Sequence, residues 1–155
     1  MPKTIIPDTS CLIALDNVGL LHILKSLYNE VLIPEEVKVE FGLSLPSWIK
    51  VHNFDKKLLY IMKLFLPLRL GKGETEVLLC GLEKEDSVVV LDDKRARKVA
   101  QELGIRYTGT LAILIKAKKV GLIGQLKPIL NKLEQSGFRI SPSLKQKALE
   151  LAGEG

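Results

Sequence analysis

Short apolar runs that end in acidic residues alternate with longer amphipathic stretches along this chain. Residues 4–7 form a β-branched run that ends in proline just before Asp8, and residues 87–91 (SVVVL) end just before Asp92 and Asp93. Apolar runs of this length, rich in β-branched residues, are typical of buried strands. We expect further short strands at 31–33 and 105–109, and a short strand or extended turn in FRIS near the C-terminus.

The stretches between these runs repeat their apolar residues with a helical period. Thr9 or Ser10 can cap the first of the expected helices. Residues 42–51 are rich in turn formers, and residues 68–73 form a basic connector that contains glycine. The expected helices cover 11–27 with a break at Gly19, 35–41, 56–66, 74–85, 93–103, 110–120, 123–137 and the C-terminal stretch. Alternating strands and helices predict an α/β fold with three layers, in which helices cover both faces of a central parallel sheet.

Length and composition fit one compact domain over residues 1–155. Hydrophobic residues make up 46% of the chain and charged residues 26%, so a core can form without disulfides or structural zinc. Cys11 and Cys80 lie in apolar surroundings and are expected to be buried in a reducing compartment. The N-terminal stretch has neither the pattern of a signal peptide nor that of a membrane span, so cytoplasmic residence is expected. The net charge of +5 favours an anionic partner, but only weakly.

Acidic residues at strand ends are the first candidates for chemistry. In open α/β sheets the functional crevice lies at the carboxyl ends of the strands, where Asp8, Asp92 and Asp93 are expected. An aspartate after a strand also caps the next helix, so each one alone has a structural explanation. Two separate strands that end in acid favour a functional role. Ser10 could support Asp8 by hydrogen bonding, or serve only as a cap.

Glutamates on two expected helices extend this acidic set. Glu36 and Glu40 are four residues apart and share a helix face. Glu74 is explained by the positive end of its helix, whereas Glu76 lies deeper and precedes an apolar run. Crowded carboxylates repel one another unless a cation lies among them, and their hard oxygens suit Mg²⁺ or Mn²⁺. Such a site can hydrolyse a phosphodiester bond without a protein nucleophile.

A basic run follows the second acidic strand end. Lys94, Arg95 and Arg97 lie at the start of the expected helix 93–103. Such a run is often a solvated helix face. Beside an acidic site it could also hold the backbone of a nucleic acid.

These motifs, taken in order, resemble those of the PIN-domain ribonucleases, and more closely a PIN-like branch found in archaea and bacteria. The similarity covers nearly the whole chain. The matching pieces are DTSCLIAL, PEEVKVEF, GKGETEVLLCGLE, VVVLDDKRARKVAQELGI, GTLAILIKAKKVGLI and SGFRIS.

The resemblance implies a nuclease in which four acids gather Mg²⁺ or Mn²⁺ to cleave RNA. The acids correspond to Asp8, with Ser10 as its hydroxyl neighbour, and to Glu40, Glu76 and Asp93. Glu76 stands where the family usually has aspartate, and Leu91 stands where it has threonine. Asp92 remains a rival to Asp93, and Glu74 a weaker rival to Glu76. Many relatives are toxins held inactive by a small antitoxin protein, and many form homodimers.

Two other functions compete with this one. A phosphatase with a nucleophilic aspartate at position 8 would need a second acid where this chain has Ser10. The other is a non-catalytic module that binds nucleic acid or protein and has lost a competent metal site.

Overall fold

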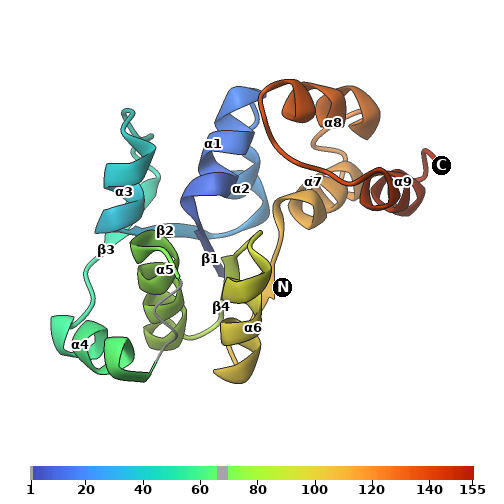
Figure 1. The fold of residues 1–155 in the computed structure, drawn as a ribbon. Helices are drawn as coiled ribbons and strands as arrows, with labels where there is room; N and C mark the ends of the chain where they lie inside the picture. Colours follow the sequence, from blue (N-terminus) through green and yellow to red (C-terminus); the bar gives the residue numbers. More distant parts are fainter. Residues whose placement is uncertain (1, 66–69) are drawn as a thin grey trace.

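The computed structural model describes residues 2–65 and 70–155, and it confirms the α/β fold (Figure 1). The strands of the described residues form one five-stranded sheet that is parallel throughout, in the order β3-β2-β1-β4-β5. They are β1 (Thr4–Pro7), β2 (Glu30–Pro34), β3 (Ile49–His52), β4 (Ser87–Val90) and β5 (Tyr107–Thr108).

Helices flank the sheet on both faces, as the alternation predicted. The helices are α1 (Thr9–Asn17), α2 (Ile23–Leu27), α3 (Glu35–Phe41), α4 (Lys56–Phe65), α5 (Lys72–Glu83), α6 (Lys94–Glu102), α7 (Thr110–Lys119), α8 (Leu126–Gln135) and α9 (Pro142–Leu151). Figure 1 shows α5 and α6 on one side of the strands and α1 and α2 on the other. The connections from β1 to β2 and from β4 to β5 run in opposite directions across the sheet. Since crossovers between parallel strands are right-handed, their helices lie on opposite faces.

The strand order places a switch point beside β1. The chain first builds β2 and β3 on one side of β1, then returns to add β4 and β5 on the other side. A parallel sheet opens a crevice at the carboxyl ends of its strands where the strand order reverses. Asp8 follows β1, and Asp92 comes shortly after the end of β4. Because β1 and β4 pair, both aspartates lie at this crevice.

The core consists of the apolar strands and the helix faces against them. Ile5 and Ile6 of β1 and Val89 and Val90 of β4 are fully buried, as expected for strands covered on both faces. Cys11 and Cys80 are buried free thiols, in agreement with the expectation from their apolar surroundings. No helix in the described ranges is both long and apolar enough to cross a membrane.

Several expected boundaries need correction. Residues 42–51 were expected to be turn-rich, but Ile49–His52 forms β3 by pairing with β2. Thr9 or Ser10 was expected to cap α1, whereas Asp8 is the cap. Of the two structures expected for FRIS, a short strand or an extended turn, the strand does not form. The break at Gly19 is confirmed, with a φ of +70° that glycine adopts readily. The expected helix end at residue 66 and the start of the connector at 68–69 lie outside the described residues.

The last three helices form a group of their own, held by a carboxylate near the C-terminus. Glu154 accepts hydrogen bonds from Lys118 Nζ at 2.5 Å and from the backbone N–H of Leu126 at 2.6 Å. These bonds lower the pKa of Glu154 to about 2. Helices α7 and α8 are thereby tied to the segment after α9.

Candidate active site

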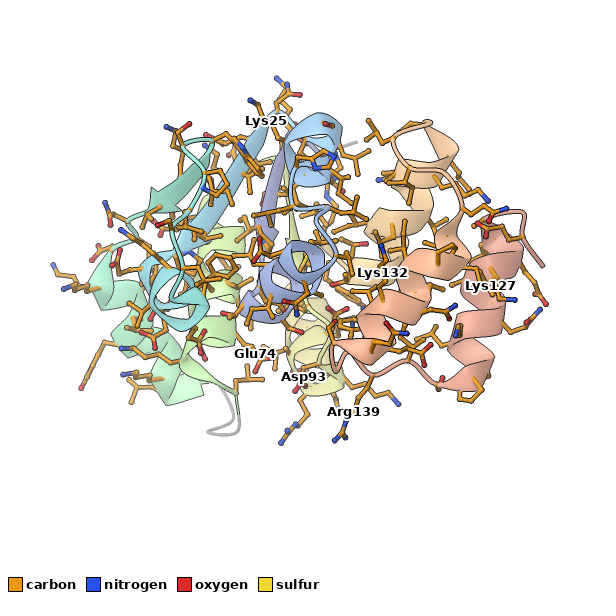
Figure 2. The ribbon with its side chains drawn as sticks, turned by 90° about the horizontal axis from the view of Figure 1, so that it is seen from above. Lys25, Glu74, Asp93, Lys127, Lys132 and Arg139 are labelled. Carbon is orange, nitrogen blue, oxygen red and sulfur yellow. The ribbon has the colours of Figure 1, made fainter. Side chains whose placement is uncertain are left out.

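A pocket of about 690 Å³ lies at the carboxyl ends of β1 and β4. Its wall combines one side of α1 along its length, the end of α3, the start of α5, the loop after β4 and the segment 136–139 between α8 and α9. Figure 2 shows Glu74, Asp93 and Arg139 at one edge of the molecule, although their positions in the chain are far apart. Of the described residues, five acids line the pocket: Asp8, Glu40, Glu74, Asp92 and Asp93.

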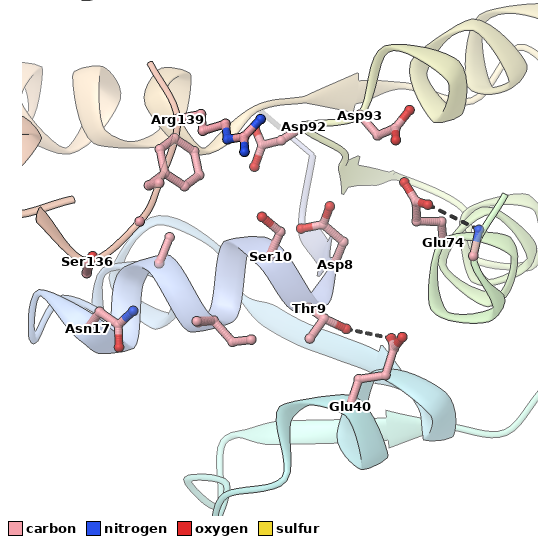
Figure 3. A pocket seen from close by; sticks show the side chains of 15 residues that line it. Asp8, Thr9, Ser10, Asn17, Glu40, Glu74, Asp92, Asp93, Ser136 and Arg139 are labelled. Atoms are coloured by element: carbon pink, nitrogen blue, oxygen red, sulfur yellow. Dashed lines mark hydrogen bonds between the residues drawn. The ribbon is translucent and has the colours of Figure 1, made fainter. Parts of the chain in front are cut away.

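Asp8 is the most buried of these acids, with 5% of its surface exposed. Its Oδ1 accepts the backbone N–H of Cys11 at 2.9 Å, so it caps α1 while it also lines the pocket (Figure 3). The structural and functional explanations of Asp8 are therefore compatible. Burial, and then the negative charge of Asp92, raise the pKa of Asp8 to about 7.

Asp92 is held firmly by the start of α7. Its two carboxylate oxygens accept the backbone N–H of Thr110 at 3.1 Å and the Thr110 hydroxyl at 2.6 Å. Arg97 Nη2 lies 3.7 Å from Asp92 Oδ1. Gly109 makes room for this pair, because a Cβ at position 109 would lie 2.3 Å from Arg97 Nη2. Asp92 thus has its own partners, which suits a positioning role.

Asp93 caps α6 and faces the same pocket. Its Oδ1 accepts the backbone N–H groups of Arg95 at 2.7 Å and Ala96 at 3.3 Å. No described residue forms a hydrogen bond to its Oδ2. One oxygen of Asp93 therefore fixes the side chain while the other remains available to a ligand.

Glu40 and Glu74 close the side of the pocket formed by α3 and α5. Glu40 Oε1 accepts the Thr9 hydroxyl at 2.8 Å, and Glu74 Oε1 accepts the backbone N–H of Gly71 at 3.2 Å (Figure 3). Glu40 lies directly against Gly73, where a Cβ would be 2.0 Å from its Oε1. Burial is the largest cause of a raised pKa at Glu74, and the nearby charges of Asp93 and Glu40 also raise it.

Glu76 does not line this pocket. It is buried, and its Oε1 accepts the backbone N–H of Glu36 at 3.4 Å, at the start of α3. Burial raises the pKa of Glu76 as well. Two residues along a helix rotate a side chain by roughly 200°, so Glu74 and Glu76 point in different directions. The structure therefore brings Glu74 to the other acids.

Other pocket residues were less evident from the sequence. Ser10 lines the pocket beside Asp8, as its spacing suggested (Figure 3). Phe138 and Arg139 also line it, as do Thr9 and Asn17, for which nothing in the local pattern indicated such a place. The signal for Phe138 and Arg139 was the SGFRIS motif, which lies between two helices and brings a cation to an acidic pocket.

The basic residues expected near the site have different surroundings. Arg95 Nε lies 3.9 Å from Asp93 Oδ1, and Arg97 faces Asp92. Lys94 is exposed beside the pocket and lines a neighbouring one.

The donor set of the pocket suits Mg²⁺ or Mn²⁺, because its acids offer hard carboxylate oxygens. Burial, together with the charges of neighbouring acids, raises the pKa of Asp8 and of Glu74, and a bound cation would offset this cost. Within the described residues, no three His, Cys, Asp or Glu side chains are grouped closely enough to hold an ion. Magnesium commonly retains several waters and binds through one or two carboxylates, so the set fits an ion held with water and substrate oxygens.

A protein-family model described as a PIN domain matches residues 4–154. This chain belongs to the PIN-domain family. PIN domains are generally nucleases and usually use divalent metals. The acidic pocket at the switch point of the sheet is consistent with that chemistry. No curated protein and no solved structure matches this PIN domain.

Proposed function

We propose that this PIN domain is an endoribonuclease that hydrolyses phosphodiester bonds in single-stranded RNA with Mg²⁺ or Mn²⁺. The observation that carries the proposal is the pocket at the ends of β1 and β4, where acids from separate elements face one another and the buried Asp8 has a pKa of about 7. Carboxyl groups whose pKa is strongly shifted by burial and by a neighbouring charge are typical of functional sites.

The metal would be held by Asp8 and Asp93, with Glu40 and Glu74 completing the acidic wall. Glu74 takes the place that the sequence resemblance gave to Glu76, because Glu74 lines the pocket. When bound, the ion would supply hydroxide at neutral pH and a counter-charge for the phosphoryl oxygens. Asp92 positions the loop after β4 through Thr110, and Ser10 can orient a water beside Asp8. Arg139 offers a cation to a phosphate at the rim.

The test is cleavage of a fluorescent single-stranded RNA by the purified protein with Mn²⁺ or Mg²⁺. We expect cleavage by the wild type, and a loss of at least about 100-fold on Asp8→Asn, as when one catalytic electrostatic group is removed. Mn²⁺ should also raise the melting temperature of the wild type but not of Asp8→Asn. RNA binding without cleavage at any metal concentration would contradict the proposal.

A second candidate is a non-catalytic PIN module that binds nucleic acid or protein. One observation favours it: in the described part of the chain no three His, Cys, Asp or Glu side chains are grouped closely enough to hold an ion. It predicts RNA binding that neither metal ion nor Asp8→Asn alters.

The biological setting rests on the family resemblance. We propose a cytoplasmic toxin that is held inactive by a small antitoxin protein, and that forms a homodimer. A neighbouring gene for a small DNA-binding protein that copurifies with this chain and blocks cleavage would support the toxin role. Light scattering of the purified chain tests the dimer.

A further inference from the structure

A second pocket of about 500 Å³ adjoins the acidic one. The two pockets share Asp92, Phe138 and Arg139 in their walls. The second pocket extends away from the acids, between the start of α6, the end of β5 and the helices α7 and α9. A chain-like ligand that occupies the acidic pocket can therefore continue into the second one.

The charge of the second pocket is opposite to that of the first. Four cations line it, Lys94, Arg97, Arg139 and Lys147, against the single carboxylate of Asp92. Asp92 is already bonded to Thr110 and faces Arg97. Among the residues that the structure describes, none forms an ion pair with Lys94, Arg139 or Lys147. The rim thus offers positive charge to an anionic ligand.

The interior of the second pocket is apolar and partly aromatic. Leu111, Ala112 and Ile115 come from α7, and Leu144 and Ala148 come from α9. Phe138 lies where the two pockets join, and the guanidinium of Arg97 lies 5.6 Å from the centre of the Tyr107 ring. Aromatic rings such as those of Phe138 and Tyr107, and an arginine guanidinium, are the surfaces on which unpaired nucleobases stack.

We propose that this second pocket binds one nucleotide of a single-stranded RNA next to the bond in the acidic pocket. The base lies between α7 and α9, and the neighbouring phosphates contact Lys94, Arg139 and Lys147. A nucleotide is the occupant that combines a flat apolar ring with a phosphate, which matches an apolar interior under a cationic rim. The proposal rests on the proposed RNA substrate and assigns a specific place to one part of it.

The test measures binding without cleavage. A fluorescein-labelled single-stranded RNA of twelve nucleotides is titrated with the protein in EDTA and followed by fluorescence anisotropy. Ala112 is exposed on α7, so Ala112→Trp fills the pocket from a site that tolerates a larger side chain. We expect affinity to fall roughly 10- to 100-fold, the scale of one lost stacked base. Gln146→Trp, an exposed change on α9 outside the pocket lining, should leave affinity unchanged.

A variant that removes one positive charge tests the phosphate contacts independently. Lys147→Gln should weaken binding and reduce the slope of log K against log salt concentration by about 0.7, the value for one phosphate contact on a single strand. Lys25→Gln is the matched control, because Lys25 lies at the opposite edge of the molecule from Arg139 (Figure 2). Its slope should equal that of the wild type.

The outcomes separate this inference from the proposed function. If Ala112→Trp and Lys147→Gln weaken RNA binding while the wild type cleaves no RNA with Mn²⁺, the nucleotide pocket is supported and the proposed nuclease function is contradicted. If the wild type cleaves but both variants bind RNA as it does, the nucleotide pocket is wrong and a different ligand, such as an acidic peptide, is indicated. Melting temperatures within a few degrees of the wild type confirm that the variants fold.

Discussion

At the scale of single residues, the site centres on one buried carboxylate that lies among other acids. Asp8 carries the largest consequence, since it is buried beside Asp92 and has a pKa of about 7 against an ordinary value of 3.8. A carboxyl group with a raised folded-state pKa holds its proton where the unfolded chain has lost it. The contribution of Asp8 to the free energy of unfolding therefore falls as pH rises from about 4 to about 7, and stays low above that range.

Asp8→Asn should therefore stabilise the metal-free protein at pH 8. Asparagine can still cap α1 but carries no charge, so we expect a gain of up to about 4 kcal/mol in the free energy of unfolding. The gain should vanish near pH 4. Urea unfolding in EDTA at both pH values measures it, with Asp16→Asn as an exposed control. A variant less stable than the wild type at pH 8 would contradict the prediction that the charge of Asp8 destabilises the folded protein.

The choice between Glu74 and Glu76 is a second prediction at this scale. Glu74→Gln should reduce metal-dependent cleavage by at least about 10-fold, as when a partner around a metal is lost. Glu76→Gln should leave the cleavage rate within about three-fold of the wild type, because Glu76 contacts the start of α3 outside the pocket. Initial rates of both variants at saturating Mn²⁺ compare the two. The reverse order would return Glu76 to the site.

At the scale of elements, the pocket depends on how closely α3 approaches α5. Gly73 permits this approach, because any side chain there would meet Glu40. Gly73→Ala should displace Glu40 and reduce cleavage by about 10-fold. Stability should be unchanged or higher by about 0.5–1 kcal/mol, since alanine favours a helix and the end of Glu40 can move aside. Cleavage assays and thermal unfolding check both, and Gly124→Ala, where a Cβ meets nothing within 4 Å, is the control.

The elements also show how far the sequence alone could predict this protein. The strand ends at Asp8 and Asp92 were predictable, because a buried strand and its following acid form a local pattern. The strand β3 was not, because its short and partly exposed run gains its order from pairing with β2. The place of Glu74 in the pocket could not be predicted from the sequence either. Its direction depends on how α5 is rotated against α3, which no local spacing records.

At the scale of the whole molecule, Glu154 joins the C-terminus to α7 and α8. Its pKa of about 2 means that the carboxylate contributes stability above pH 4.5, and that this contribution is lost as pH falls toward 2. Glu154→Gln should therefore lower the melting temperature at pH 7, with a difference that disappears near pH 2. Scanning calorimetry across this range measures it, and Glu102→Gln on the exposed face of α6 is the control. Equal melting temperatures at pH 7 would show that the contact contributes nothing.

The segment 136–139 supplies one wall of the pocket, although the acids it faces are all in place by residue 93. During synthesis the acids therefore leave the ribosome well before the wall that completes their pocket. A chain released before residue 136 would carry every proposed metal ligand and still lack Phe138 and Arg139. If the proposed function holds, partial translation products of this gene should accordingly bind RNA weakly.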